Sequence, residues 1–280
     1  KAAPDTVVIA MLDPNPLVSG QGIEKLKNQG INVITRVLEL QATQLNAGFV
    51  KRMTQKLPFV RVKMGMSLDG GTALSNGISQ WITGPESRHD VQYLRAASSA
   101  ILSTATTVQN DDASLNVRLS AEQLNQQTGV RQPMRVIIDN SLKLTGKEKL
   151  FELGGEIWIF TTQQDEEVLS YFKLHHKNVS IFTSVTSKRI EIKDVLLKLA
   201  KMEINEVHTE CGSTLAGALI QQQLVDELVL YMAPDLMGKQ AQGLFDLGEI
   251  SIMSDKIQLS IADVRMIGRD IKIVAKPCQP

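Results

Sequence analysis

The chain has 280 residues, with 30 basic residues balanced by 30 acidic ones and an aromatic content of 4%. This length provides for one large domain with its own core, or for such a domain plus a smaller piece. The absence of a basic stripe argues against a nucleic-acid partner, and the scarcity of aromatic residues argues against a stacking platform for single strands.

The apolar runs are only as long as strands, so no segment is expected to span a membrane, and the first residues show no hydrophobic region of a signal peptide. The two cysteines, Cys211 and Cys278, cannot form a disulfide framework and have no metal-ligand spacing. We therefore expect a cytoplasmic protein.

The N-terminal residues predict a small βαβ unit with parallel strands. Residues 6–11 form a β-branched run, Gly20 and Gly30 bracket a short helical segment, and residues 31–37 read as a second strand. Residues 41–54 are expected to form a helix and residues 55–58 a linker. This unit is either a small N-terminal extension or part of another domain.

The pattern then alternates between strand and helix. A strand begins at Phe59 and places Val60, Val62 and Met64 on one face. After a glycine-rich loop, residues 83–86 have the spacing of a capping box with a proline in the first helical turn. The following helix is expected to bury Val91 and Leu94, and a strand at 100–103 is expected to lead into a loop over residues 106–118.

The remaining strands are predicted at residues 135–139, 156–160, 179–182, 206–210, 227–232, 258–261 and 270–274. Helices are expected over residues 191–202, with apolar residues at helical spacing, and from the glycine after Cys211 to residue 223. The last strands follow one another without helices between them, so the sheet is expected to be mixed.

Two segments have the chemistry of a site. Residues 210–217 end a strand in Glu210 and open a helix with small residues, which is typical of an anion site at a helix N-terminus but also of ordinary helix–sheet packing. Residues 63–83 form either one wall of a polar pocket or a surface hairpin with a core tryptophan, Trp81. Arg95 and Arg118 either converge on a phosphate or lie on solvated faces.

Several classes of site are disfavoured. The four histidines, His89, His175, His176 and His208, lack the context of zinc ligands and are interpreted as structural or surface residues, so no metal site is expected in this chain. There is no nucleophile elbow of a serine hydrolase, no Walker loop and no dinucleotide fingerprint.

In the segments 63–83 and 210–217 and around Arg95 and Arg118, the sequence resembles a known family, the bifunctional riboflavin-biosynthesis proteins, in which a pyrimidine deaminase is fused to a reductase. The resemblance covers about residues 59–274 and depends on six motifs in register. They are Lys-Met-Gly-Met-Ser-Leu-Asp-Gly at 63–70, Ser-Gln-Trp-Ile-Thr at 79–83, Leu-Arg-Ala at 94–96, Thr-Val-Gln-Asn-Asp-Asp at 107–112, Leu-Asn-Val-Arg at 115–118 and Glu-Cys-Gly-Ser-Thr-Leu-Ala-Gly-Ala at 210–218.

The resemblance implies an α/β fold similar to dihydrofolate reductase, with a mixed sheet flanked by helices that binds NADPH without a Rossmann motif. The implied reaction reduces 5-amino-6-(5-phosphoribosylamino)uracil to its phosphoribitylamino product. Hydride is expected to pass from the nicotinamide to the anomeric carbon of a ring-opened imine, while the protein orients the reactants.

The carry-over of the motifs assigns residues to two ligands. Substrate contacts are expected from Ser79, Arg95, Leu115, Arg118 and Glu210, with Arg95 and Arg118 at the phosphate. Cofactor contacts are expected from Gly65, Trp81, Thr107, Asp111, Asn140, Gly212, Ser213, Thr214, Leu215, Ala216, Gly217 and Ala218.

Catalytic roles are expected for Lys63, which could help to move a proton, and for Glu210, which would orient the amine. Gly65 and Trp81 are expected to face the cofactor, while Lys63 and Ser79 face the substrate.

The same resemblance explains the N-terminal unit. Residues 7–20 resemble the end of the family's cytidine-deaminase-like domain, so residues 1–57 are expected to be a truncated remnant of it plus a linker, and residues 58–280 the reductase domain. The zinc motifs of a deaminase are absent from the sequence, so zinc is expected only in a missing portion of the parent protein.

Two alternatives remain: a zinc-dependent deaminase as the main activity, if the missing segment is present, and a non-catalytic nucleotide-binding relative. A homodimer or higher homo-oligomer is expected, with a phosphorylated ribosylaminopyrimidine as the small-molecule partner and neither nucleic acid nor membrane.

Overall fold

The computed structural model describes residues 4–185 and 188–278. They fall into two compact units, one made of the chain up to Phe59 together with Leu196–Asn205, the other of Val60–Val195 and the chain from Glu206 onward. No helix in this described part is long and apolar enough to cross a membrane.

The first unit contains the predicted βαβ arrangement. Strand β1 (Thr6–Ile9) pairs in parallel with β2 (Asn32–Thr35), and α1 (Gln21–Asn28) connects them. The single helix predicted over residues 41–54 is wrong, because α2 (Glu39–Leu45) and α3 (Ala47–Gln55) are separated at Asn46, whose φ of −114° and ψ of 25° are not helical.

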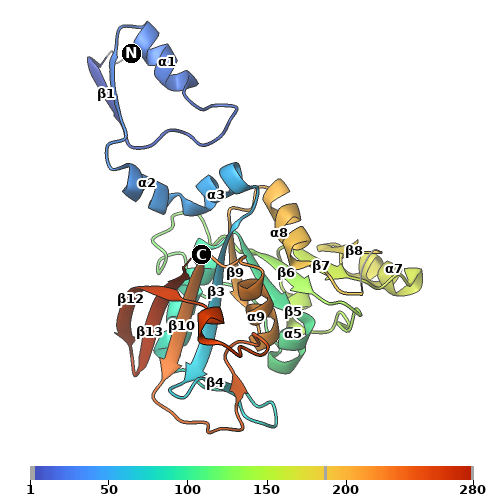
Figure 1. Ribbon diagram of the computed structural model, residues 1–280. Coiled ribbons are helices and arrows are strands. Elements are labelled where there is room, and N and C mark those ends of the chain that lie inside the picture. Colours follow the sequence, from blue (N-terminus) through green and yellow to red (C-terminus); the bar gives the residue numbers. More distant parts are fainter. Residues whose placement is uncertain (1–3, 186–187, 279–280) are drawn as a thin grey trace. The chain divides into compact units, whose positions relative to one another are not determined.

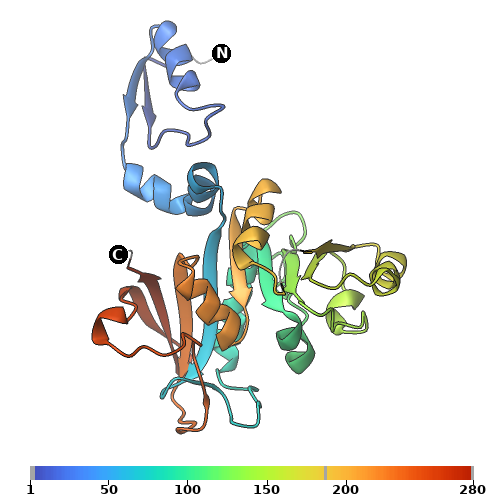
Figure 2. The ribbon, with the colours of Figure 1, turned by 45° about the vertical axis from the view of Figure 1, so that its right-hand side comes forward.

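The second unit is built on a nine-stranded sheet within the described residues, in the order β12-β13-β10-β3-β9-β5-β6-β7-β8. Figure 2 shows the red strands at one edge and the olive strands at the other. The strands are β3 (Phe59–Ser67), β5 (Ala100–Thr104), β6 (Met134–Ile138), β7 (Ile157–Thr161), β8 (Val179–Thr183), β9 (Glu206–Glu210), β10 (Glu227–Ala233), β12 (Leu259–Ile267) and β13 (Asp270–Pro277). A separate short pair joins β4 (Gly71–Ala73) to β11 (Gln242–Gly243).

The prediction of a mixed sheet is confirmed. The pairs β10–β3, β5–β9, β5–β6, β6–β7 and β7–β8 are parallel, whereas β13 runs antiparallel to both β10 and β12. Parallel neighbours end at the same edge of a sheet, so the segments that follow β5, β6 and β9 emerge side by side. That edge holds most of the residues predicted to bind ligands.

Helices cover the sheet, as Figure 1 shows for α9 in front of it. The helices of the second unit are α4 (Pro85–Ala97), α5 (Ala105–Asp111), α6 (Lys149–Glu152), α7 (Glu166–His175) and α9 (Ser213–Gln221), with a 3₁₀ turn, η1, at Met253–Asp255. Helix α8 (Ile192–Lys201) begins in this unit and continues into the first. The loop predicted over residues 106–118 is wrong in its first half, because α5 forms there. This helix starts where the Thr104 hydroxyl accepts a hydrogen bond from the Thr107 N–H, at 3.2 Å.

The start of α4 also differs from the prediction. Its N-cap is Gly84, without a side-chain cap, so the capping box predicted at residues 83–86 is wrong. Instead the buried carboxylate of Asp270 accepts hydrogen bonds from the Gly84 N–H at 2.7 Å and from the Ser87 hydroxyl at 2.6 Å. A carboxylate there also complements the positive end of the helix dipole.

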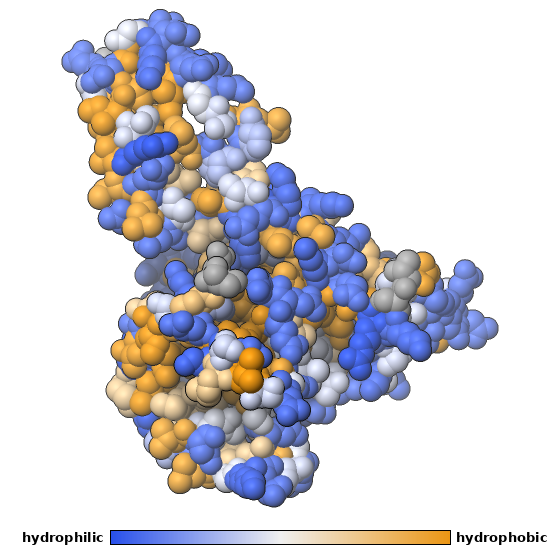
Figure 3. Space-filling view, viewed as in Figure 1, coloured by the Kyte–Doolittle hydropathy of each residue, from blue (hydrophilic) through white to orange (hydrophobic). Residues whose placement is uncertain are grey.

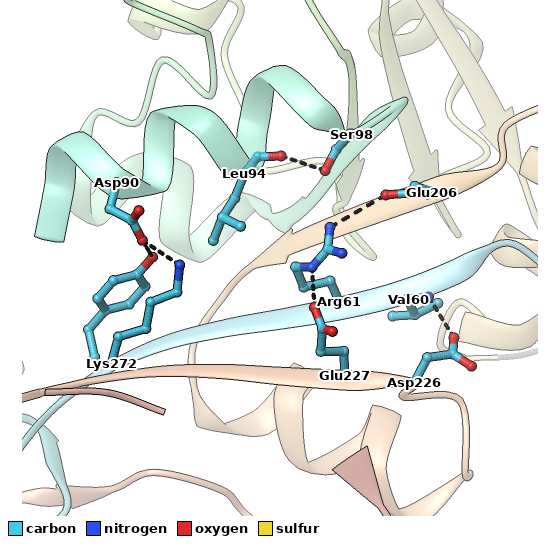
Figure 4. Close-up of polar contacts among 10 residues, drawn as sticks. Val60, Arg61, Asp90, Leu94, Ser98, Glu206, Asp226, Glu227 and Lys272 are labelled. Carbon is cyan, nitrogen blue, oxygen red and sulfur yellow. Dashed lines mark hydrogen bonds and ion pairs between the residues drawn. The ribbon is translucent and has the colours of Figure 1, made fainter. Parts of the chain in front are cut away.

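The face of α4 that meets the sheet combines apolar and polar contacts. Val91 packs with Val229 and Tyr231, and Leu94 joins them at the rim. Figure 4 shows Asp90 reaching down to Lys272, whose Nζ lies 2.6 Å from its Oδ2, and Tyr231 donates its hydroxyl proton to the same oxygen. These contacts hold α4 firmly on the sheet.

The central strands are buried on both faces, as expected for the parallel part of a sheet. The alternation predicted for β3 is confirmed, since Val60, Val62 and Met64 are at most 3% exposed. Trp81 is 73% exposed, which excludes the alternative of a core tryptophan in the 63–83 segment.

The edge strand β12 differs from the others because its side chains remain exposed. Ile261, Val264 and Met266 are 64%, 56% and 60% exposed. In Figure 3 apolar side chains gather over this region of the surface. A long apolar edge strand is a template for pairing with another chain.

Candidate active site

Glu210 is the centre of the candidate site. It ends β9, and its carboxylate is held by the guanidinium of Arg95 from α4 in a two-point ion pair, with Nε 2.5 Å from Oε1 and Nη2 2.9 Å from Oε2. The third guanidinium nitrogen of Arg95 donates to the Asn116 carbonyl at 2.8 Å. One arginine thus joins α4, β9 and the chain after α5.

The charges around Glu210 keep it ionised. Burial by itself would raise the pKa of this carboxyl, but the positive charge of Arg95, the contact with His208 and the charge of Lys63 hold the pKa well below its usual range. Lys63 lies on the neighbouring strand β3, and its charge is close enough to favour the ionised form of Glu210.

Arg118 lies near this ion pair but is exposed. Burial and repulsion by Arg95 lower the pKa of Arg118, while Glu210 opposes that shift. A pocket of about 270 Å³ lies beside it, lined also by Arg88, His89 and Gln92. The two arginines predicted at a phosphate therefore differ, since Arg95 is committed to Glu210 whereas the guanidinium of Arg118 borders open space.

His208 is part of this cluster, although no functional role was predicted for it from its sequence context. It is fully buried in β9, and its Nε2 lies 3.3 Å from Oε1 of Glu210. Residues two apart on a strand point to the same face, so the signal for this neighbour was the spacing of His208 and Glu210. The interpretation of His208 as a structural histidine agrees with its burial, but the contact with Glu210 was not predicted.

The predicted cofactor tract at residues 212–218 forms the start of α9. Gly212 is its N-cap, with no side-chain cap, and a Cβ at this position would have no atom within 4 Å. Ser213 and Thr214 are partly buried or exposed, whereas Leu215, Ala216 and Gly217 are buried. The tract therefore divides into an open helix start and a packed turn that includes Ala218.

Gly217 has a packing reason for being glycine, because a Cβ there would lie 2.0 Å from the Asp246 carbonyl oxygen. The chain after β11 is fixed to α9 by the Asp246 N–H, which donates to the Ser213 carbonyl at 3.1 Å, and by Gln221, which donates to the Leu247 carbonyl. Close packing thus accounts for the second half of the tract, while its first half is an open helix start.

The structure brings a second group of predicted residues together near α5. The Ser79 hydroxyl lies 3.4 Å from Oδ1 of Asp111, and Thr107 lies in the first turn of α5, 3.1 Å from the Thr104 hydroxyl. The exposed Trp81 is covered by the guanidinium of Arg88, 4.7 Å from the ring centre. A predicted substrate residue, Ser79, therefore touches a predicted cofactor residue, Asp111.

Three predicted residues have structural contacts that limit what they can offer a ligand. Leu115 is buried in the core, 1% exposed, with a φ of 48°, so it has little surface to offer a ligand. Asn140 follows β6, where its side-chain oxygen accepts from the Ile190 N–H at 2.8 Å. Gly65 lies within β3, where a Cβ would meet Thr83 at an ordinary 3.4 Å.

Among the described residues, no group of three or more His, Cys, Asp and Glu side chains is arranged to hold a metal ion. Cys211, next to Glu210, is also poorly reactive, because burial raises the pKa of its thiol to about 12.

Comparison with known proteins identifies the family of this chain. The family model described as the RibD C-terminal domain matches residues 58–273. The riboflavin biosynthesis protein RibD of Escherichia coli K12 is 40% identical over 275 residues, covering 95% of this chain and 72% of its own length.

Two further relatives are a shorter protein and a solved structure. The 5-amino-6-(5-phosphoribosylamino)uracil reductase of Buchnera aphidicola subsp. Acyrthosiphon pisum is 35% identical over 212 residues, covering 73% of this chain and 99% of its own length. The structure of Acinetobacter baumannii RibD, form 1, superimposes with a TM-score of 0.86 at 35% identity, covering 98% of this chain and 73% of that one. On the matched span of more than half its length, this chain belongs to the RibD C-terminal domain family.

Proposed function

We propose that this chain is a riboflavin-biosynthesis reductase, which reduces 5-amino-6-(5-phosphoribosylamino)uracil to the phosphoribitylamino product with NADPH. The observation that carries the proposal is the Glu210 carboxylate, which Arg95 holds and the charge of Lys63 keeps ionised, at the sheet edge beside the open start of α9. The Buchnera relative, which bears the name of this reductase, aligns with this chain over 99% of its own length, and this supports the proposal.

The residues present fit a dinucleotide. The uncapped start of α9 leaves backbone N–H groups for a pyrophosphate, and the open position at Gly212 lets an anion approach the backbone closely. Gly65, Trp81, Thr107, Asp111, Asn140 and the 212–218 tract would hold NADPH, with Gly217 supporting the tract from behind. When bound, NADPH supplies the hydride.

The protein's own residues prepare the acceptor. Opening of the ribose ring gives a carbon–nitrogen double bond. When hydride bonds to the anomeric carbon, the π electrons move to the nitrogen, which takes up a proton. Glu210 accepts a hydrogen bond from the substrate amine and orients it, while Lys63 supplies the proton from Nζ. Ser79 contacts the substrate, and Leu115 supports the site from the core.

We assign the substrate phosphate to Arg118. Its guanidinium borders a pocket that Arg88 and His89 also line, so an anion there meets positive charge. Arg95 acts through Glu210, because each of its three guanidinium nitrogens already donates to that carboxylate or to the Asn116 carbonyl.

We also infer the organisation of the whole chain. Residues 58–280 form a reductase domain with a fold similar to dihydrofolate reductase, and residues 1–57 are the end of a cytidine-deaminase-like domain plus a linker. The alignment with Escherichia coli RibD supports the second part, since it covers 95% of this chain, more than the family model's 58–273. The parent activity would then include a zinc-dependent deamination, in a cytoplasmic homo-oligomer.

The test follows the absorbance of NADPH and of NADH with the phosphoribosylamino substrate. We expect oxidation of NADPH, and a faster rate with NADPH than with NADH supports the cofactor assignment. Equal rates with both cofactors refute the NADPH preference, and no oxidation of either refutes the reductase. For the catalytic pair, Lys63→Ala and Glu210→Ala should each lose turnover; normal turnover with unchanged substrate affinity removes both roles.

A further inference from the structure

His208 occupies a position where a histidine needs an explanation. Its side chain is fully buried in β9, and neither ring nitrogen has a hydrogen-bond partner of good geometry among the described residues. Buried polar atoms are almost always satisfied, and an exception points to strain or to function. The nearest polar atom is Oε1 of Glu210, 3.3 Å from Nε2.

The surroundings require this imidazole to be neutral. Lys63 faces it from β3, Arg95 from α4 and Glu210 from its own strand. Burial lowers the pKa of His208. The positive charges of Lys63 and Arg95 lower this pKa further, and Glu210 only partly opposes these effects. A neutral ring carries one N–H, and its other nitrogen accepts.

The hydrogen bonds that the Glu210 carboxylate already accepts show what that N–H can do. Arg95 contacts both carboxylate oxygens along one direction, in the plane of its guanidinium. A donor at Nε2 of His208 would reach Oε1 from within β9, so the carboxylate would be fixed from two elements. Catalytic hydrogen bonds are often long in the absence of ligands and shorten when the complex forms, which suits the 3.3 Å separation.

We propose that His208 is a positioning residue of this site: its neutral imidazole donates from Nε2 to Oε1 of Glu210 and, together with Arg95, fixes the orientation in which Glu210 meets the substrate amine. The proposal rests on the proposed function for the identity of the reaction. The contact between imidazole and carboxylate can be tested without that reaction.

The kinetic test compares three variants. His208→Leu removes the donor at similar volume, His208→Gln retains an N–H on a side chain of similar reach, and His175→Gln alters an exposed histidine on α7. We expect His208→Leu to lose about tenfold in kcat/KM for the phosphoribosylamino substrate, the value of one hydrogen bond to a charged group. KM for NADPH should stay unchanged.

The pH profile separates positioning from packing. Loss of a donor to the carboxylate raises the pKa of Glu210, so the acid limb of kcat/KM should move to higher pH in His208→Leu and return towards wild type in His208→Gln. His175→Gln should match wild type. Equal activity of His208→Leu and His208→Gln, or an acid limb that does not move, overturns the proposal.

The second measurement uses the wild-type protein labelled with ¹⁵N-histidine. We expect the resonance assigned to His208 to show a neutral ring protonated at Nε2 between pH 5 and 8, whereas a ring that gains charge in this range, or is protonated at Nδ1, overturns the proposal. If wild type fails to oxidise NADPH, the proposed function fails, and the tautomer still decides whether His208 donates to Glu210.

Discussion

Gly217 and Asp246 meet backbone to backbone: a Cβ atom added to the glycine would lie 2.0 Å from the carbonyl oxygen of the aspartate. We therefore expect Gly217→Ala to displace the chain after β11 from α9. Overpacking of this kind costs about 1–3 kcal/mol in the free energy of unfolding. Urea denaturation measures this loss.

The matched control for that change is Gly212→Ala, five residues earlier on the same tract. A Cβ at Gly212 meets no atom within 4 Å, and this glycine has an extended backbone, so stability should stay at the wild-type value. Its expected effect is on NADPH affinity, because the methyl group would stand where a pyrophosphate approaches. Equal stability losses in both variants would contradict the packing explanation.

Arg118→Ala is expected to weaken binding of the phosphorylated substrate. Loss of a charged hydrogen bond to phosphate should raise KM by about 10- to 100-fold. KM for the dephosphorylated substrate should not change, because this substrate lacks the phosphate that Arg118 is proposed to bind. The control is Arg36→Ala, which removes the same charge from an exposed site in the first unit. A similar KM increase with both substrates would show that Arg118 does not bind the phosphate.

Stability should fall in mild acid because of His208. The pKa of this imidazole is lowered in the folded protein by burial, so below about pH 6.5 the unfolded chain takes up a proton that the folded chain excludes. The free energy of unfolding should therefore decrease as the pH falls from about 6.5 to 5, by at most about 1.4 kcal/mol per pH unit.

This dependence is measured by urea denaturation at a series of pH values. His208→Gln should lose the slope in this window, and His175→Gln should retain it. Glu210 contributes at lower pH, because the pKa of this carboxyl is depressed and its stabilisation is lost as the pH falls below about 4.3. An unchanged slope in His208→Gln would assign the acid sensitivity to other groups.

Asp69 fixes the loop after β10. Its carboxylate accepts from the Ser67 hydroxyl at 2.5 Å, from the Met237 N–H at 3.1 Å and from the Gly238 N–H at 2.7 Å. These bonds, the Ser67 contact first, lower the pKa of Asp69 to about 2. Its contribution is complete above about pH 4 and is lost as the pH falls towards 2.

Asp69→Asn should therefore accelerate amide hydrogen exchange at Met237 and Gly238. The amide of Leu230, in the core of β10, serves as the internal control and should exchange at the wild-type rate. Unchanged exchange in the loop would show that the carboxylate charge is not what holds it.

The exposed apolar strand β12 is the expected site of self-association. Val264→Asp places a charge in the centre of this edge and should reduce the molar mass in solution to that of the monomer. Leu174→Asp changes an equally apolar, 75% exposed residue on α7 and should leave the mass unchanged. If light scattering gives the same mass for wild type and Val264→Asp, β12 is not the interface.

The parts of the fold that could be predicted from the sequence are those whose pattern lies within a few neighbouring residues. The strand ending at Glu210 and the helix beginning after Gly212 were predicted because five strand residues meet a run of small helix-forming residues. In contrast, α5 has only Ala105 and Val108 buried, so its polar sequence carries no apolar period. Its start depends on a single hydroxyl, that of Thr104.

Contacts between distant residues could not be predicted. Asp270 binds the start of α4 from 183 residues away, where no local pattern reveals it. The two-point pairing of Arg95 with Glu210 spans 115 residues. For the same reason Arg95 and Arg118 were predicted as equivalent phosphate ligands, although the fold buries Arg95 against the carboxylate of Glu210.

Helix α4 is anchored at both ends by carboxylates, Asp270 at its N-terminus and Glu210 at Arg95. It is 13 residues long, about 20 Å, and Asp270 opens the strand that pairs with the exposed edge β12. The helix therefore connects the outer hairpin to the carboxylate of Glu210, through Asp270 at one end and Arg95 at the other. We therefore expect that a partner which docks on β12 and shifts this hairpin would change the orientation of the Glu210 carboxylate, without contacting the substrate or NADPH.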